Sequence, residues 1–136
     1  MNWFVVGGRE YDVSILDVEE NFNILYSENT GRTIAIGAPL TLDPYGTFYG
    51  HKIVVAAKKG KENEFEQLFE FVSKPRYNGI PVILPHGKNI ISYMAYVSNG
   101  SRSYKKINQD ISGNIVDAIY ESFTINFIPI NAQVIP

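Results

Sequence analysis

The class of fold is decided by the stretch Glu121-Ser122-Phe123-Thr124-Ile125-Asn126-Phe127-Ile128 near the end of the chain. Its apolar residues Phe123, Ile125 and Phe127 fall at every second position. A period of two is typical of a half-buried β-strand, whereas a helix repeats its apolar residues every three to four positions. The sequence therefore predicts a strand here, with one apolar face packed on a core.

The same alternation continues upstream along most of the chain. The predicted strands span residues 11–15, 22–26, 32–36, 47–57, 80–84, 89–97, 102–107 and 121–128. Among the connections, acidic segment 17–21 is predicted as a turn and 37–46 as an exposed loop with two prolines. Residues 85–87 are predicted as a hairpin turn, and 108–116 is polar with no regular pattern.

One amphipathic helix is predicted, because four apolar residues repeat at helical spacing: Phe65, Leu68, Phe69 and Val72. Asn63 and Glu66 have the spacing of a capping box at its start. Pro75 ends it, since proline disfavours helical geometry in the preceding residue. About three turns are too short to be stable alone, so the helix must lie on a sheet.

Together these elements predict one α+β, mainly β domain over residues 1–136. We expect an antiparallel β-sandwich or split barrel of about seven or eight strands, with one α-helix on its flank. A chain of 136 residues is long enough to bury a core without disulfides or a structural metal.

Composition excludes several classes of function. The chain has no cysteine, which excludes a disulfide framework, a thiol nucleophile and thiolate metal sites. Its net charge of −2 gives no global attraction to nucleic acid or anionic membranes. Neither a signal peptide nor an apolar run of about 18 residues is visible, so we expect a cytoplasmic protein that does not insert into membranes.

No motif predicts an enzyme. His51 and His86 are isolated, without the spacing of a metal site, and there is no Gly-x-Ser-x-Gly elbow or phosphate-binding loop. We expect His51 to be a half-exposed strand residue and His86 a solvated turn residue. The sequence thus predicts no catalytic residue, metal, cofactor or small-molecule substrate.

Two charged groups are candidates for a surface role. Asp17, Glu19 and Glu20 are predicted as solvated charge in a turn rather than as glycosidase carboxylates. The basic group around Arg102 resembles a nucleic-acid surface only loosely, because lysines are also a common protection of edge strands.

The aromatic residues favour an interaction protein. Nine Tyr and eight Phe exceed what one face of a small core needs. Tyrosine is enriched at protein interfaces, because its ring is buried while its hydroxyl finds a partner. The alternative is a carbohydrate- or receptor-binding module, since aromatic faces stack on sugars.

The order of turns and strands resembles small tail-module proteins of phages and prophages from Gram-positive bacteria. It is similar to the N-terminal half of distal tail proteins and, more distantly, to the tail-tube fold. The segments that carry the resemblance are 29–32, 46–49, the helix at 64–72, 80–87, 95–101 and 123–129.

The resemblance implies a structural virion protein that forms rings around a central channel. Such rings usually have six copies, extend sheets between neighbours and contact other tail proteins. The residues expected at the interface between copies are Tyr45, Phe48, Tyr49, Arg102 and Tyr104. Asp17, Glu19 and Glu20 are expected to face the channel, through which DNA only passes. The place in the tail, whether tube, hub or completion protein, stays open. Assembly would occur in the host cytoplasm, before incorporation into the virion tail.

Overall fold

The computed structural model describes residues 3–27, 31–32 and 40–136. Over these ranges the chain forms ten strands and one α-helix. The elements are β1 (Val5–Val6), β2 (Arg9–Glu10), β3 (Ser14–Tyr26), β4 (Gly31–Arg32), β5 (Leu40–Thr41), β6 (Pro44–Ala56), α1 (Glu62–Val72), β7 (Ile80–His86), β8 (Asn89–Tyr96), β9 (Gly100–Gln109) and β10 (Ile115–Pro129). The predicted mainly β, antiparallel class with one helix is confirmed.

Eight of these strands form one hydrogen-bonded sheet, in the order β2-β1-β7-β8-β10-β6-β3, with β9 attached to β10. The short pair β4–β5 is separate. β10 is the branch point, because three neighbours pair with different parts of it. Its residues 115–125 pair with β9, 123–127 with β6, and 128–129 with β8. The strand that decides the fold in the sequence therefore lies at the centre of the sheet.

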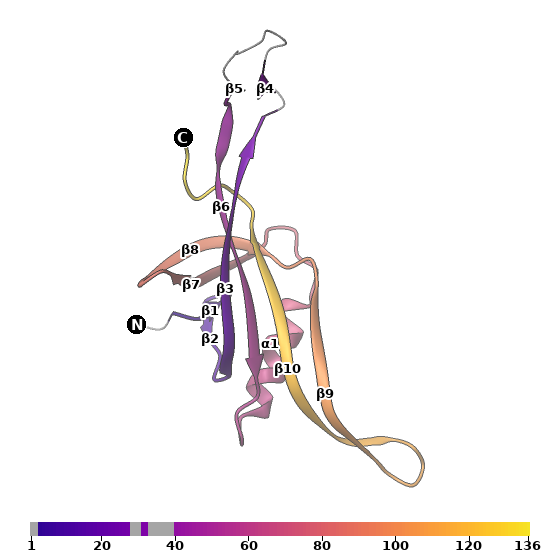
Figure 1. Ribbon diagram of the computed structural model, residues 1–136. Coiled ribbons are helices and arrows are strands. Elements are labelled where there is room, and N and C mark those ends of the chain that lie inside the picture. The colour runs from indigo at the N-terminus through magenta and orange to yellow at the C-terminus, as the bar shows by residue number, and fades with distance from the viewer. Residues whose placement is uncertain (1–2, 28–30, 33–39) are drawn as a thin grey trace.

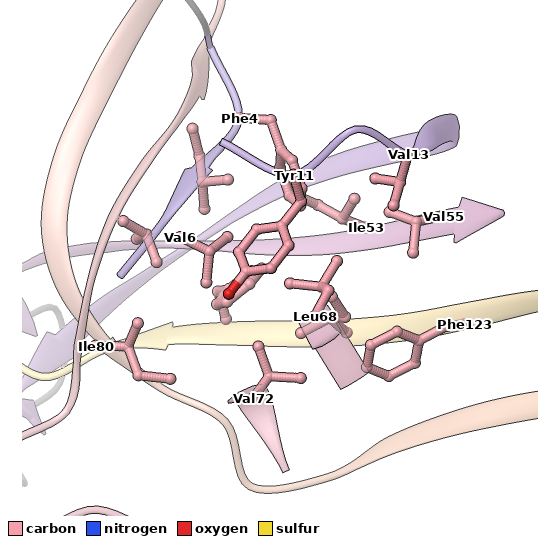
Figure 2. Close-up of a cluster of buried hydrophobic side chains, with 14 of the residues drawn as sticks. Phe4, Val6, Tyr11, Val13, Ile53, Val55, Leu68, Val72, Ile80 and Phe123 are labelled. Carbon is pink, nitrogen blue, oxygen red and sulfur yellow. The ribbon is translucent and has the colours of Figure 1, made fainter. Parts of the chain in front are cut away.

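The core lies on the inner face of this sheet. Phe123, Ile125 and Phe127 are buried on one side of β10, as their alternation predicts. Figure 2 shows the side chains that gather there from the N-terminal segment, β6, β10 and the helix. Two helix residues, Leu68 and Val72, point into this cluster. One continuous set of buried apolar residues thus joins the helix to the sheet.

The helix differs from its prediction at its first turn. It begins at Glu62, and Lys61 at the N-cap position makes no side-chain hydrogen bond to the first turn. The predicted capping box of Asn63 and Glu66 is wrong, because the helix begins before Asn63 and places it inside the first turn. Glu66 instead contacts Arg102 and the hydroxyl of Tyr120. The end agrees with the prediction, since the last turn closes at Ser73, two residues before the proline.

The predicted turn at residues 17–21 is also wrong, because the whole segment lies inside β3. Residues 17–26 pair along β6, with register shifts beside Leu16 and before Tyr26. Acidic residues favour turns by local chemistry, yet here the long ladder to β6 fixes an extended backbone. β6 likewise begins at Pro44, inside the predicted loop 37–46, of which residues 37–39 lie outside the described chain.

The polar segment 108–116 forms the end of β9, a turn and the start of β10. Asp110 accepts hydrogen bonds from the backbone N–H groups of Ser112 and Asn114, which fixes the turn. The predicted strand 32–36 lies outside the described residues except for Arg32 in β4.

Two long hairpins extend from the body of the molecule at opposite ends (Figure 1). We call residues 21–26 of β3 with 44–49 of β6 the upper arm. We call residues 104–109 of β9 with 115–120 of β10 the lower arm. Between the arms, the helix and the β7–β8 part of the sheet lie beside the long strands β3, β6, β10 and β9 (Figure 1). The arms lie outside this packed region, which makes them the first candidates for contact with other molecules.

Candidate assembly surface

The upper arm exposes large apolar side chains to solvent. Phe22 is 65 % exposed and Tyr45 is 62 % exposed. The other exposed apolar residues of this arm are Ile24, Leu25 and Tyr26. The C-terminal segment pairs with this arm through Thr47 and Val134, yet these apolar side chains stay exposed. A hairpin with this composition is therefore suited to burial against another surface.

The lower arm has the same character at the other end of the molecule. Its turn carries Ile111, which has no cover at all in the chain. Exposed apolar residues on its two strands are Tyr104, Ile107, Ile115, Val116 and Ile119. Contiguous exposed apolar surface in a folded protein marks an interaction site. Both arms thus present apolar surface that the chain itself does not bury.

Two of the long strands, β3 and β9, each pair on one side only among the described residues. β3 pairs with β6, and β9 pairs with β10. Their outward N–H and C=O groups are therefore available to a strand from another chain. The sheet can consequently be extended at both of these edges.

The four strands β9, β10, β6 and β3 form a region with two different faces. The inner face carries the core. The outer face carries polar side chains, which are Asp17, Glu19, Asn21, Asn23, Lys52 and Asn126. On this face an open cleft of about 660 Å³ is lined by Asn21, Asn23, Phe48, Tyr96, Asn99 and Asn126, among others. Asn126 donates a hydrogen bond to the Asn99 side chain across 2.9 Å. The cleft thus combines amide side chains with aromatic and aliphatic ones, the latter including Leu25, Ile128 and Ile130.

The predicted interface residues lie in several environments. Tyr45 is exposed on the upper arm, and Phe48 and Tyr49 are half-buried beside it. The Tyr49 ring also meets His86 edge-on, with 4.8 Å between ring centroids. Tyr104 is exposed at the base of the lower arm. The contribution of these residues to an interface between copies stays a prediction.

Arg102, the remaining predicted interface residue, is engaged within the chain. Its guanidinium lies over the Phe69 ring at 3.8 Å and over the Tyr120 ring at 4.6 Å. It donates to Glu66 across 3.3 Å and to the Tyr104 hydroxyl across 3.1 Å. Only 16 % of the side chain is exposed. Arg102 therefore anchors β9 to the helix at the point where the lower arm leaves the body.

The predicted acidic group is divided by the pleat of β3. Asp17 and Glu19 lie on the outer face, since their partners on β6 are Val54 and Lys52. Glu20 lies on the inner face, opposite His51. Whether Asp17 and Glu19 face a channel stays a prediction.

His51 is buried, so the prediction of a half-exposed residue is wrong. It shares the inner face of β6 with Ile53 and Val55, which are both buried. Its Nε2–H donates to the Pro85 carbonyl across 2.7 Å. A carbonyl only accepts, so in the neutral ring Nδ1 accepts from the Tyr93 hydroxyl at 2.8 Å. The sequence held a signal for burial that the prediction did not use: His51 alternates with the apolar residues Ile53 and Val55.

The same cluster includes His86, which ends β7 instead of lying in a solvated turn. Its Nδ1–H donates to a Glu20 oxygen across 2.7 Å, and that oxygen is 3.4 Å from His51 Nε2. Burial lowers the pKa of His51, against the opposing effects of the Pro85 hydrogen bond and Glu20. Burial, together with Glu20, raises the pKa of Tyr93. Glu20, His51, His86 and Tyr93 thus connect β3, β6, β7 and β8.

The cluster has the geometry of a structural connection between strands. Within residues 3–27, 31–32 and 40–136, no group of three His, Asp or Glu side chains has an arrangement that could hold a metal ion. The sequence analysis noted each of these residues but could not predict that they lie together, because Glu20, His51 and His86 come from three distant segments.

Comparison with protein-family models, curated proteins and solved structures finds no significant match to the chain. The resemblance to phage tail proteins therefore stays a prediction. The single helix of the described chain is too short to cross a membrane.

Proposed function

We propose that the chain is a structural subunit that assembles with copies of itself into a ring of a phage tail or baseplate. The observation that carries the proposal is the pair of arms at opposite ends of the molecule, both with uncovered apolar side chains. Fully burying one large apolar side chain contributes about 1.5–3 kcal/mol. Several such residues on each arm supply a substantial driving force for association.

The edges of the sheet favour one type of symmetry. The two different edges, β3 and β9, support head-to-tail contacts, which generate a ring when the rotation closes. The open edges of β3 and β9 allow the sheet to continue from one copy to the next. Six copies and contacts with other tail proteins are what the sequence resemblance implies.

The outer face of the sheet suits the wall of a channel. It is mostly polar, and its charged residues named above are two carboxylates, Asp17 and Glu19, and one lysine, Lys52. Carboxylates repel phosphate groups, and neutral amides give no strong ionic contact to them. Such a wall lets DNA pass without holding it. The helix and β7–β8 cover the opposite face and would lie on the outside of the ring.

The mass of the purified protein in solution, with negative-stain images of the same sample, tests the proposal. We expect ring-shaped particles with a mass that is a whole multiple of 15.3 kDa. Replacing Phe22 and Ile111 by serine should shift the protein towards the monomer, because both are exposed arm residues. Tyr77 is equally exposed outside the arms, and Tyr77→Ser is the matched control. A wild-type protein that stays monomeric at high concentration, with or without neighbouring tail proteins, would contradict the proposal.

The cleft on the outer face favours a second candidate, a carbohydrate-binding module. Amide side chains such as Asn21 and Asn126 can donate to and accept from sugar hydroxyls, and Phe48 and Tyr96 offer rings for stacking. The two candidates differ in whether this face is accessible in the assembled protein. Saturation-transfer NMR with soluble bacterial cell-wall oligosaccharides should show binding that Asn126→Ala and Tyr96→Ala abolish. If rings form and no oligosaccharide binds, the carbohydrate-binding module is ruled out and the ring subunit remains.

A further inference from the structure

The two open edges of the four-stranded region carry opposite charges. On β3 the exposed side chains include Asp17 and Glu19, and on β9 they include Lys105 and Lys106. None of these four forms an ion pair with another residue in the described part of the chain. Other charged residues of the same strands do have a partner within the chain: Glu20 of β3 contacts His86, and Arg102 of β9 contacts Glu66. Each edge therefore keeps a pair of like charges that form no ion pair, although Glu19 lies opposite Lys52 on β6.

The strand directions allow β3 of one copy to pair antiparallel with β9 of the next. β9 runs antiparallel to β10, β10 to β6, and β6 to β3. Three antiparallel steps make β3 and β9 antiparallel to each other. If a second copy continues the sheet by rotation about an axis along the strands, its β9 lies antiparallel to β3 of the first. Antiparallel strands with opposite charges on facing residues stabilise each other.

We infer that β3 of one copy pairs with β9 of a second copy, in the register that places Asp17 opposite Lys105 and Glu19 diagonal to the same lysine. The inference rests on the proposed self-assembly and names the edges that form its contact. Pairing of β3 with β3 places four carboxylates together, and pairing of β9 with β9 places four ammonium groups together. Like charges disfavour both symmetric dimers. The charges thus select the head-to-tail contact that a closed ring requires.

The proposed pairing shifts each copy along the strand direction relative to its neighbour, and the size of this shift agrees with a closed barrel. Through the ladders Asp17–Val54, Val54–Thr124 and Thr124–Ser101, Asp17 lies level with Ser101 of its own copy. Facing Lys105 requires a shift of 105 − 101 = 4 residues, or about 13 Å at about 3.3 Å per residue. Four strands about 4.8 Å apart, tilted by 35–45° in a barrel, require a shift of about 13–19 Å.

Charge reversal tests the inference. We expect Asp17→Lys with Glu19→Lys to lower the assembled fraction at least tenfold at about 0.1 M salt, and Lys105→Glu with Lys106→Glu to do the same. The chain with all four substitutions should assemble again, because its charges are reversed on both edges. Glu70→Lys on the helix and Lys88→Glu in the β7–β8 turn, at exposed positions outside both strands, are the controls and should assemble as the wild type does.

Disulfide cross-linking gives a second, independent readout, since the chain has no native cysteine. Asp17→Cys is combined in turn with Ser103→Cys, Lys105→Cys and Ile107→Cys. We expect a ladder of covalent multimers from at least one combination, and none from any single cysteine.

The outcomes separate the inference from the proposed function. If wild-type protein fails to assemble, the proposed function is wrong. If wild-type protein assembles, but neither reversed edge changes assembly and no combination cross-links, the function stands and the β3–β9 contact is wrong. Cross-linking by Asp17→Cys alone would show β3–β3 pairing and would also overturn the inference.

Discussion

The two halves of β10 differ in their surroundings although they belong to one continuous strand. From Phe123 to Pro129, alternate residues are buried against the helix and the inner sheet face. From Ile115 to Ser122, in the lower arm, apolar residues such as Ile115 and Val116 are exposed. Backbone pairing with β9 is present in both halves. Hydrogen bonding thus sets the strand, whereas packing divides it into a core and a surface that another molecule can cover.

The largest expected effect is a difference in unfolding free energy between substitutions in the two halves of β10. Phe123→Ala removes a buried ring that packs on Phe65 and Phe69, and should cost about 3–5 kcal/mol of unfolding free energy. Ile115→Ala, in the same strand, should stay within about 0.5 kcal/mol of wild type under monomeric conditions. Urea unfolding at low protein concentration measures both. Equal costs would show that the lower arm is packed within its own chain.

The two histidines offer a second contrast between buried and exposed positions. His51→Leu leaves the Tyr93 hydroxyl and the Pro85 carbonyl without partners, and should cost about 1–3 kcal/mol. His86, with 40 % of its side chain exposed, makes a solvent-screened contact with Glu20. His86→Ala should therefore cost about 1 kcal/mol or less in the same unfolding experiment. A larger loss for His86 would place the main connection at Glu20 instead.

Arg102 marks the boundary between the body and the lower arm. Arg102→Met removes the contacts over Phe69 and Tyr120, and should cost about 1 kcal/mol. Lys105→Met, three residues further along β9 and fully in the arm, should leave unfolding of the monomer at low protein concentration unchanged. Thermal unfolding of both variants would test this, and a loss for Lys105→Met of the same size would move the boundary outward.

The smallest expected effect is a dependence of stability on pH. Burial lowers the pKa of His51 in the folded state below its usual value near 6.5. Because the unfolded chain takes up this proton more readily, stability is present above about pH 6.5 and decreases as the pH falls towards the folded pKa. Urea titrations from pH 7.5 to 5 should show this decrease in wild type and a flatter profile in His51→Leu. Identical profiles would assign the dependence to other groups.

Local patterns predicted the body of the molecule well. The alternation around Phe123 and the helical spacing from Phe65 to Val72 each report a face that is buried, so element type followed directly. The acidic segment 17–21 was assigned wrongly because its composition favours a turn, while its conformation is set by residues 50–54 far along the chain. Pairing over such distances leaves no local signal.

The candidate surface was less predictable, for a related physical reason. Which aromatic residues are exposed depends on what packs on them, and Tyr93 and Tyr104 look alike in sequence but differ in burial. Arg102 was predicted at an interface, and only the fold shows its contacts with Glu66 and Phe69. The cluster of Glu20, His51 and His86 combines three strands and becomes visible only when they meet.

Hydrogen–deuterium exchange at low and high protein concentration tests the central claim most directly. The account predicts that amides of residues 123–127 are protected at both concentrations. Amides of the arms, at 21–26 and 104–109, should exchange fast in the dilute protein and become protected in the concentrated, assembled one. Fast exchange of both arms at every concentration, in a sample that remains monomeric, would contradict the account.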